Sequence, residues 1–176
     1  MKKILVVIDM QKDFVDGALG TPEAVAIVGN VVKEMKKDYD MVFLTRDTHQ
    51  SNYLETQEGR NLPVVHCIEN TPGWQLNRRV ANALKKIENY EIINKPTFGS
   101  DQLAGRIAAY CKPEEIESIT LIGLCTDICV VSNAMLLKTA FMETEIRCIA
   151  SCCAGVTPAT HEAALATMKM CQVKVV

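Results

Sequence analysis

Aromatic residues, histidines and concentrated charge are all scarce in this chain of 176 residues, which has one Trp, three His and a formal net charge of −2. The basic residues are scattered, so no segment indicates a surface for nucleic acid or for an anionic membrane. No apolar run reaches the length of a membrane-spanning helix. The run at residues 4–8 is too short for a signal peptide, and Asp9 interrupts it. We therefore expect neither nucleic acid nor a membrane as a partner.

Cysteine, by contrast, is abundant, with eight residues. Most of them lie in apolar patterns typical of strands or helices, and a chain of this length does not need a disulfide scaffold to fold. The adjacent pair Cys152 and Cys153 lacks the C-x-x-C spacing of a redox motif, so we expect it to be packed in the interior. These observations predict reduced thiols and a cytoplasmic protein.

Short apolar runs alternate with amphipathic segments along the whole chain, which is 48% hydrophobic and 23% charged. Strands are expected at residues 4–8, 41–45, 91–94, 119–124, 145–150 and 172–176. Helices are expected at 21–35, 74–87, 100–111 and 126–142 and from 157 onward, with a loop at 151–155. This alternation favours parallel strands joined by right-handed crossovers. We predict a single domain, 1–176, of the α/β class: a three-layer α/β/α sandwich around a mostly parallel six-stranded sheet, Rossmann-like in architecture.

The segment 121–130 is expected to form a buried strand, a tight turn and the start of a helix. Thr126 or Asp127 can cap that helix, which places Cys129 in its first turn. The helix dipole favours an anion there, so Cys129 is predicted to form a thiolate more readily than an ordinary cysteine. The alternative is a cysteine that only packs in the core.

Two further residues follow buried strands at the same edge of the predicted sheet. Asp9 ends the first strand and Lys95 ends the third, so both can converge with Cys129 on one cleft. A carboxylate can take the proton of a thiol, and a lysine between them favours both negative charges. The alternative is an ion pair beside an unrelated cysteine.

A second group of polar residues carries two of the three histidines. Asp47 and His49 lie on one side of an extended segment, and His66 returns after a loop that contains Glu55 and Glu58. Imidazole and carboxylate ligands suit zinc, iron or manganese. The alternative is a polar surface loop without a metal.

Taken together, these motifs resemble the isochorismatase-like cysteine hydrolases and, within them, the nicotinamidases. The matching stretches are residues 9–14, 45–49, 62–67, 95–96 and 123–130, in the order of the family. The resemblance implies that Cys129 is a nucleophile, Asp9 a general base and then acid, and Lys95 their electrostatic partner. It also implies a cis peptide bond before Cys125 and an oxyanion hole formed by the backbone amides of Cys125 and Cys129.

The resemblance further assigns Asp47, His49 and His66 as metal ligands, with Glu58 as an additional carboxylate. One divalent ion is expected, zinc in preference to iron or manganese. Phe14 and Leu124 are expected to contact the substrate. Related proteins are often dimers or tetramers, so the resemblance implies a homo-oligomer.

The implied activity is hydrolysis of a small carboxamide, with nicotinamide as the first choice, through a cysteine thioester. The alternatives are another small amide or a vinyl ether such as isochorismate. A non-catalytic nucleotide-binding module ranks low, because no glycine-rich loop follows the first strand. The sequence departs from the family pattern at Pro63, where many nicotinamidases have an aromatic residue, at Cys125, usually alanine, and at Ser151, often aspartate.

Overall fold

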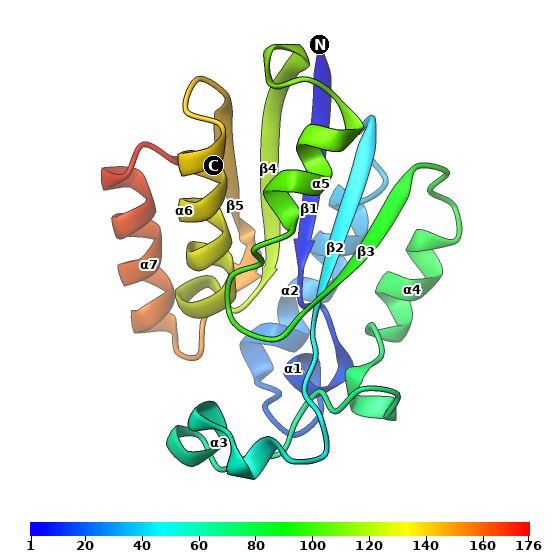
Figure 1. The fold of residues 1–176 in the computed structure, drawn as a ribbon, viewed down its shortest axis with the longest axis vertical. Helices are drawn as coiled ribbons and strands as arrows, with labels where there is room; N and C mark the ends of the chain where they lie inside the picture. The colour runs from blue at the N-terminus through cyan, green and yellow to red at the C-terminus, as the bar shows by residue number, and fades with distance from the viewer.

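The computed structural model describes residues 1–176 and is built around one six-stranded sheet in which all neighbouring strands pair in parallel. The strands are β1 (Lys2–Ile8), β2 (Met41–Asp47), β3 (Tyr90–Lys95), β4 (Ile116–Leu124), β5 (Glu145–Ala154) and β6 (Lys174–Val175). Their order across the sheet is β3-β2-β1-β4-β5-β6 (Figure 1). The predicted fold class is confirmed, with a sheet that is fully rather than mostly parallel.

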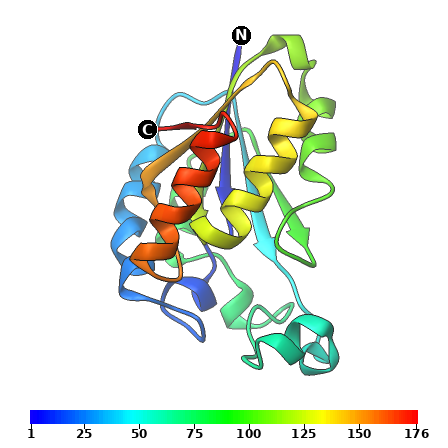
Figure 2. The ribbon, with the colours of Figure 1, turned by 90° about the vertical axis from the view of Figure 1, so that its left-hand side faces the viewer.

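Helices cover both faces of the sheet, because its central strands are apolar on both sides. The helices are α1 (Lys12–Val15), α2 (Pro22–Glu34), α3 (Gln57–Asn61), α4 (Arg78–Leu84), α5 (Leu103–Tyr110), α6 (Val131–Ala140) and α7 (Pro158–Met170). One apolar cluster joins the sheet to α5, α6 and α7, and another joins its opposite face to α2 and α4. Figure 2 shows α6 and α7 side by side on the first of these faces. None of the helices combines the length and apolar character needed to cross a membrane.

Local signals in the sequence account for where the longest helices begin. The hydroxyl of Thr21 accepts a hydrogen bond from the amide of Ala24, and Pro22 occupies the first turn of α2. Thr157 and Pro158 repeat this arrangement at α7. A capping hydroxyl and a proline both suit a helix start, since the first N–H groups lack partners within the helix.

Three predicted elements differ from the structure. The helix expected at 74–87 is instead a short 3₁₀ turn, Pro72–Trp74, followed by α4. The loop expected at 151–155 continues β5 as far as Ala154, with a bulge between its two stretches of pairing to β4. The turn after β4 is a π-helical turn, Thr126–Val130, that leads into α6, and no side chain caps it.

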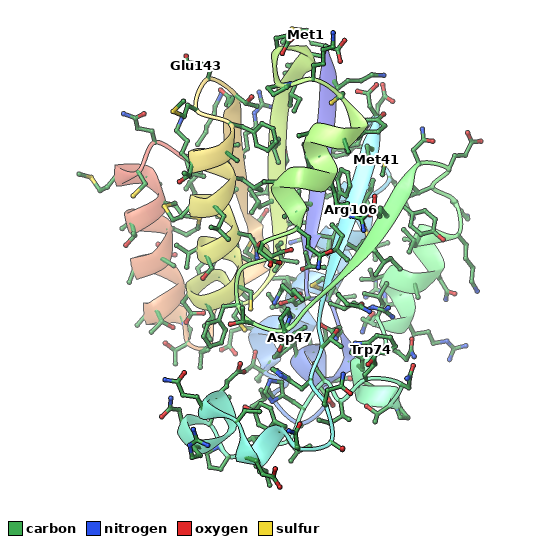
Figure 3. The ribbon with its side chains drawn as sticks, viewed as in Figure 1. Met1, Met41, Asp47, Trp74, Arg106 and Glu143 are labelled. Atoms are coloured by element: carbon green, nitrogen blue, oxygen red, sulfur yellow. The ribbon has the colours of Figure 1, made fainter.

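Gly123 brings β1 and β4 unusually close at the end of the sheet that carries the polar residues. Gly123 pairs with Ile8 and has a φ of +119°, and a Cβ at this position would lie 2.1 Å from the carbonyl oxygen of Ile8. Only glycine fits such a contact and conformation. Residues after β1 and β4 are therefore adjacent, and Figure 3 places Asp47 of β2 at the same end, opposite Met1 and Glu143.

Candidate active site

Asp9, Lys95 and Cys129 converge beneath the C-terminal ends of three strands, as predicted. The ammonium of Lys95 lies 2.6 Å from Asp9 Oδ2 and 3.5 Å from Cys129 Sγ. Thr45 donates a 2.6 Å hydrogen bond to Asp9 Oδ1, and Lys95 also donates to the carbonyl of Thr97. Asp9 is fully buried and Lys95 is 1% exposed, so the pair is held away from bulk water.

Burial dominates the electrostatics of this cluster. It raises the pKa of Asp9 although the Lys95 ammonium opposes the shift. Burial would lower the pKa of Lys95, but the charges of Asp9, Cys129 and Asp47 together outweigh it and raise the pKa, which keeps the ammonium charged. Burial, followed by the charge of Asp9, also raises the pKa of the Cys129 thiol well above its usual range. The expected preference for a thiolate at a helix start is therefore wrong for the resting site, where the proton must have an acceptor before the sulfur can attack.

The turn that carries Cys129 begins at a cis peptide bond between Leu124 and Cys125, at the bond that the family resemblance implies. The carbonyl of Cys125 accepts hydrogen bonds from the amides of Ile128 and Val130, which fixes the turn. The amide of Cys125 donates to no group of the chain. It is therefore available to a ligand in the cavity that both cysteines line.

Asp47, His49, Glu58 and His66 form the second cluster, and their ligand atoms all lie within 4.8 Å of one another. Asp47 Oδ2 lies 2.9 Å from His49 Nε2 and 3.5 Å from His66 Nε2. Glu58 Oε1 lies 3.4 Å from His49 Nε2 and 3.9 Å from His66 Nε2. Ligand atoms bound to one ion at about 2.0–2.2 Å lie roughly 2.8–3.6 Å apart when they are neighbours in an octahedral or a tetrahedral arrangement, and more than four positions leave room for a substrate atom. The donor types and spacings thus fit a divalent cation, whereas Glu55 is not part of the group.

The surroundings of the cluster orient its ligand atoms. His66 Nδ1 lies 2.7 Å from the carbonyl of Val64 and donates to it, so Nε2 is the ring nitrogen that faces the cluster. The buried ring of Tyr53 packs against both His49 and His66, with centroid distances of 4.7 and 4.9 Å. Beside Glu58, Gly59 approaches the carbonyl of Tyr53 so closely that a Cβ would lie 2.0 Å from it.

The pKa values of the two carboxylates in this cluster shift in opposite directions. Burial would raise the pKa of Asp47, but the hydrogen bonds from His49 and His66 and the charge of Lys95 hold it well below its usual range. Burial and the neighbouring Asp47 raise the pKa of Glu58. A cation placed between such groups favours the ionised form of both carboxylates.

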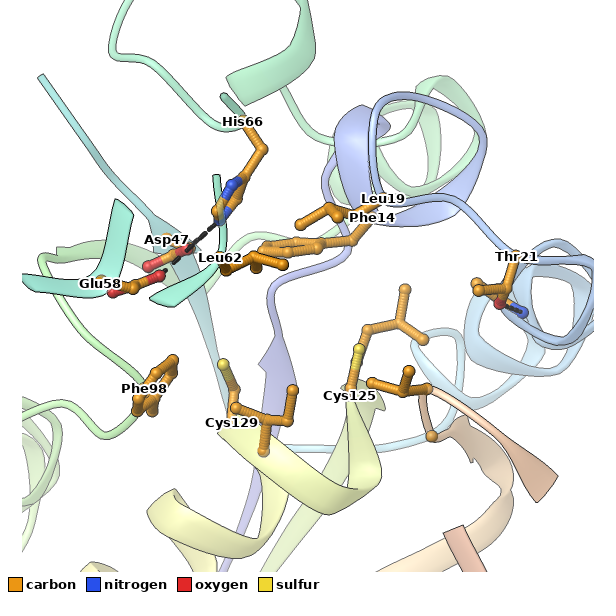
Figure 4. A pocket seen from close by; sticks show the side chains of 15 residues that line it. Phe14, Leu19, Thr21, Asp47, Glu58, Leu62, His66, Phe98, Cys125 and Cys129 are labelled. Atoms are coloured by element: carbon orange, nitrogen blue, oxygen red, sulfur yellow. Dashed lines mark hydrogen bonds and ion pairs between the residues drawn. The ribbon is translucent and has the colours of Figure 1, made fainter. Parts of the chain in front are cut away.

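A cavity of about 230 Å³ joins the two clusters (Figure 4). Its lining is Phe14, Leu19, Thr21, Ala24, Asp47, Glu58, Leu62, His66, Phe98, Leu124, Cys125, Ile128, Cys129, Gly155 and Val156. Phe14 and Leu124 are there as predicted. Neither Lys nor Arg lines the cavity, and its only charged lining side chains are those of the metal cluster.

Several residues of the site were not identified from the sequence. Leu62, Ile128 and Val156 line the cavity from loops or turns whose placement depends on the tertiary fold. Gln11 lies below the metal cluster, where its side-chain amide bonds the backbone N–H and C=O of Asp47. Of these residues only Gln11 had a signal in the sequence, because it belongs to the segment 9–14 that also holds Asp9.

The departures from the family pattern fall at different places. Pro63 is exposed and does not line the cavity, whereas the preceding Leu62 does. Cys125 lines the cavity with its side chain. Ser151 is exposed in β5, where its carbonyl accepts a hydrogen bond from Asn30, so its side chain is not part of the site.

Comparisons with known proteins match nearly the whole chain. The family model of the isochorismatase domain matches residues 3–176. An isochorismatase family protein of Bacillus subtilis (strain 168), PncA, is 30% identical over 145 residues, which cover 77% of this chain and 78% of that protein. The crystal structure of nicotinamidase PncA from Bacillus subtilis is similar with a TM-score of 0.84 and 26% identity, over 100% of this chain and 99% of that one. A crystal structure of the pyrazinamidase of Pyrococcus horikoshii in complex with zinc has a TM-score of 0.80 and 26% identity, over 100% and 99% of the two chains.

Proposed function

This chain belongs to the isochorismatase family and is a hydrolase of that family acting on an amide, and on this premise we propose that it converts nicotinamide to nicotinate and ammonia. One observation carries the proposal: a single cavity is lined both by a thiol that has a buried Asp–Lys pair beside it and by three residues of a four-residue metal cluster. Cys129 is the nucleophile, Asp9 the base and acid, and Lys95 the cation that holds the two in register.

The reaction proceeds in two halves. Asp9 accepts the proton of the Cys129 thiol, and the sulfur attacks the carboxamide carbon while the amides of Cys125 and Cys129 stabilise the oxyanion. The C–N bond then breaks, and Asp9 returns the proton to the departing ammonia. Water, activated by Asp9, attacks the thioester, which releases the carboxylate and restores the thiol.

Asp47, His49, Glu58 and His66 would hold one divalent ion, zinc in preference to iron or manganese, and that ion would offer a ligand position to the ring nitrogen of the substrate. The protein's own contribution is positioning. Phe14 and Leu62 offer apolar contacts to the ring beside His66, and Cys129 lies across the cavity from them (Figure 4). Holding a reactant in one orientation relative to the nucleophile lowers the entropic part of the barrier.

The charge of the residues that line the cavity favours a neutral amide over isochorismate as the substrate. Isochorismate carries two carboxylates, whereas no Lys or Arg lines the cavity and Asp47 and Glu58 face it. Lys95 is already paired with Asp9 and almost fully buried. An anionic substrate would lose hydration without gaining a cationic partner from the protein, which is costly.

The test is a comparison of nicotinamide with benzamide, which has the same shape but lacks the ring nitrogen. A site built around one polar contact rejects an analogue lacking it strongly, so we expect nicotinamide to be hydrolysed at least ~100-fold faster, measured as kcat/KM for ammonia release. The variant His49→Ala should lose most of that preference. The variant Cys129→Ala should keep its fold by circular dichroism and lose turnover.

Two results would contradict the proposal. Equal rates on both amides, or a preference retained in His49→Ala, would point to a different small amide bound without the metal. Substantial activity in Cys129→Ala would show that Cys129 is not the nucleophile.

A further inference from the structure

Asn133 lies behind the cavity wall, on α6, and is fully buried. Its side chain makes three hydrogen bonds, all to backbone groups. Nδ2 donates to the carbonyls of Cys129 (2.8 Å) and Phe98 (3.2 Å), and Oδ1 accepts from the amide of Ser100 (3.0 Å). One side chain therefore connects the turn that carries the thiol to the segment between β3 and α5.

The segment 96–100 carries two groups that face the site. The carbonyl of Thr97 accepts a hydrogen bond from the Lys95 ammonium at 2.9 Å. The ring of Phe98 lines the cavity, between Glu58 and Cys129 in Figure 4. Gly99 then packs against Leu136 of α6, where a Cβ would lie 2.6 Å from the leucine side chain. The position of this segment against α6 thus sets one wall of the cavity.

The pattern of donors and acceptors around Asn133 suits a carboxamide specifically. Two carbonyls need donors and one N–H needs an acceptor, which is the complement of an asparagine side chain. The amide of Ser100 has no other acceptor in the chain. Removing the side chain would leave the buried amide of Ser100 without an acceptor, so the segment would have to move to satisfy it.

We propose that Asn133 is a positioning residue that holds the 96–100 segment, and with it the ring of Phe98, in register with Cys129. The proposal rests on the proposed function, because it assigns Asn133 to the placement of a substrate against the thiol. It acts through Phe98 and has no contact with the substrate itself.

A double-mutant cycle on kcat/KM for nicotinamide tests the proposal. We expect Asn133→Ala to lower kcat/KM roughly 10- to 100-fold, because a small displacement of a substrate-positioning wall is that costly. In a Phe98→Ala background the same change should cost about threefold or less, because both changes remove the same wall. The matched control is Ile116→Ala, a buried core change at the opposite end of β4. Losses that multiply in the double variant, or an equal loss in Ile116→Ala at the same unfolding temperature, would overturn the proposal.

Hydrogen exchange at the Ser100 amide provides a readout that needs no substrate. Protection should disappear in Asn133→Ala and persist in Asn133→Asp, which keeps the acceptor but loses both donors. Protection retained in Asn133→Ala would show that Asn133 does not hold the segment. If the wild-type protein hydrolyses no carboxamide, the proposed function fails, and the exchange of Ser100 still decides whether the segment depends on Asn133.

Discussion

Cys129 shows how burial can outweigh a helix terminus at the scale of one residue. The turn before α6 offers free N–H groups, but the thiol is 5% exposed and the charge of Asp9 is close by, so its pKa rises. Desolvation of an anion costs more than a partial dipole returns. A thiol that stays protonated at rest makes the ionisation state of Asp9 decisive for activity.

We therefore expect the acid limb of the kcat/KM profile to depend on Asp9. Activity needs the carboxylate, so it is lost as the pH falls through the pKa of Asp9, which burial raises above the usual value. The hydrogen bond from Thr45 stabilises the ionised form and lowers that pKa. The variant Thr45→Val should thus raise the pKa further and move the acid limb to higher pH.

The measurement is a comparison of the pH profiles of kcat/KM for the wild-type protein and Thr45→Val. Thr144→Val, a buried threonine next to β5 and far from the site, is the control and should leave the limb in place. An acid limb that is unchanged in Thr45→Val, or that moves to lower pH, would show that the ionisation of Asp9 does not set it.

At the scale of elements, the sequence predicted what local pattern determines. All six strands and the helix starts at Thr21 and Thr157 follow from apolar runs and capping residues. The predicted helix from Trp74 was wrong because residues 75–77 are held by tertiary contacts: the carbonyl of Gln75 accepts from Lys12, and Asn77 donates to Met10. The continuation of β5 depends on pairing with β4, which no local pattern encodes.

Gln11 acts at the scale of elements, because its side-chain hydrogen bonds connect the segment after β1 to the end of β2. Its side chain donates to the carbonyls of Asp47 (2.8 Å) and Trp74 (2.9 Å) and accepts from the amide of Asp47 (2.7 Å). We expect Gln11→Glu, which keeps the acceptor and loses both donors, to weaken metal binding about 10- to 100-fold, as other changes behind metal ligands do.

Competition with a chromogenic chelator measures that affinity directly. Gln102→Glu adds the same charge at an exposed position next to α5 and serves as the control. An unchanged affinity in Gln11→Glu, or an equal loss in Gln102→Glu, would mean that the backbone of Asp47 needs no support from this side chain.

At the scale of the whole molecule, the site is assembled from segments far apart in the sequence. The residues at strand ends could be predicted, since parallel strands end at one edge. The contacts that loop residues make with one another could not be predicted from the sequence. His49 and His66 come together because His49 donates its backbone N–H to the carbonyl of Cys67, and Cys67 in turn donates to Asp13. Such a closure depends on the folded positions of three segments.

The metal cluster should consequently couple ion binding to the stability of the whole fold. A ligand that binds only the folded state stabilises it by about 2.7 kcal/mol at a hundredfold excess over its Kd. We expect zinc to raise the unfolding temperature of the apo-protein in a concentration-dependent manner, and a chelator to reverse the shift. The shift should persist in Cys129→Ala and vanish in His66→Ala, because the cluster needs both imidazoles to close the loop. Cys171→Ser removes the exposed thiol that offers zinc an alternative site, so a shift that disappears in Cys171→Ser but survives in His66→Ala would place the ion outside the cavity.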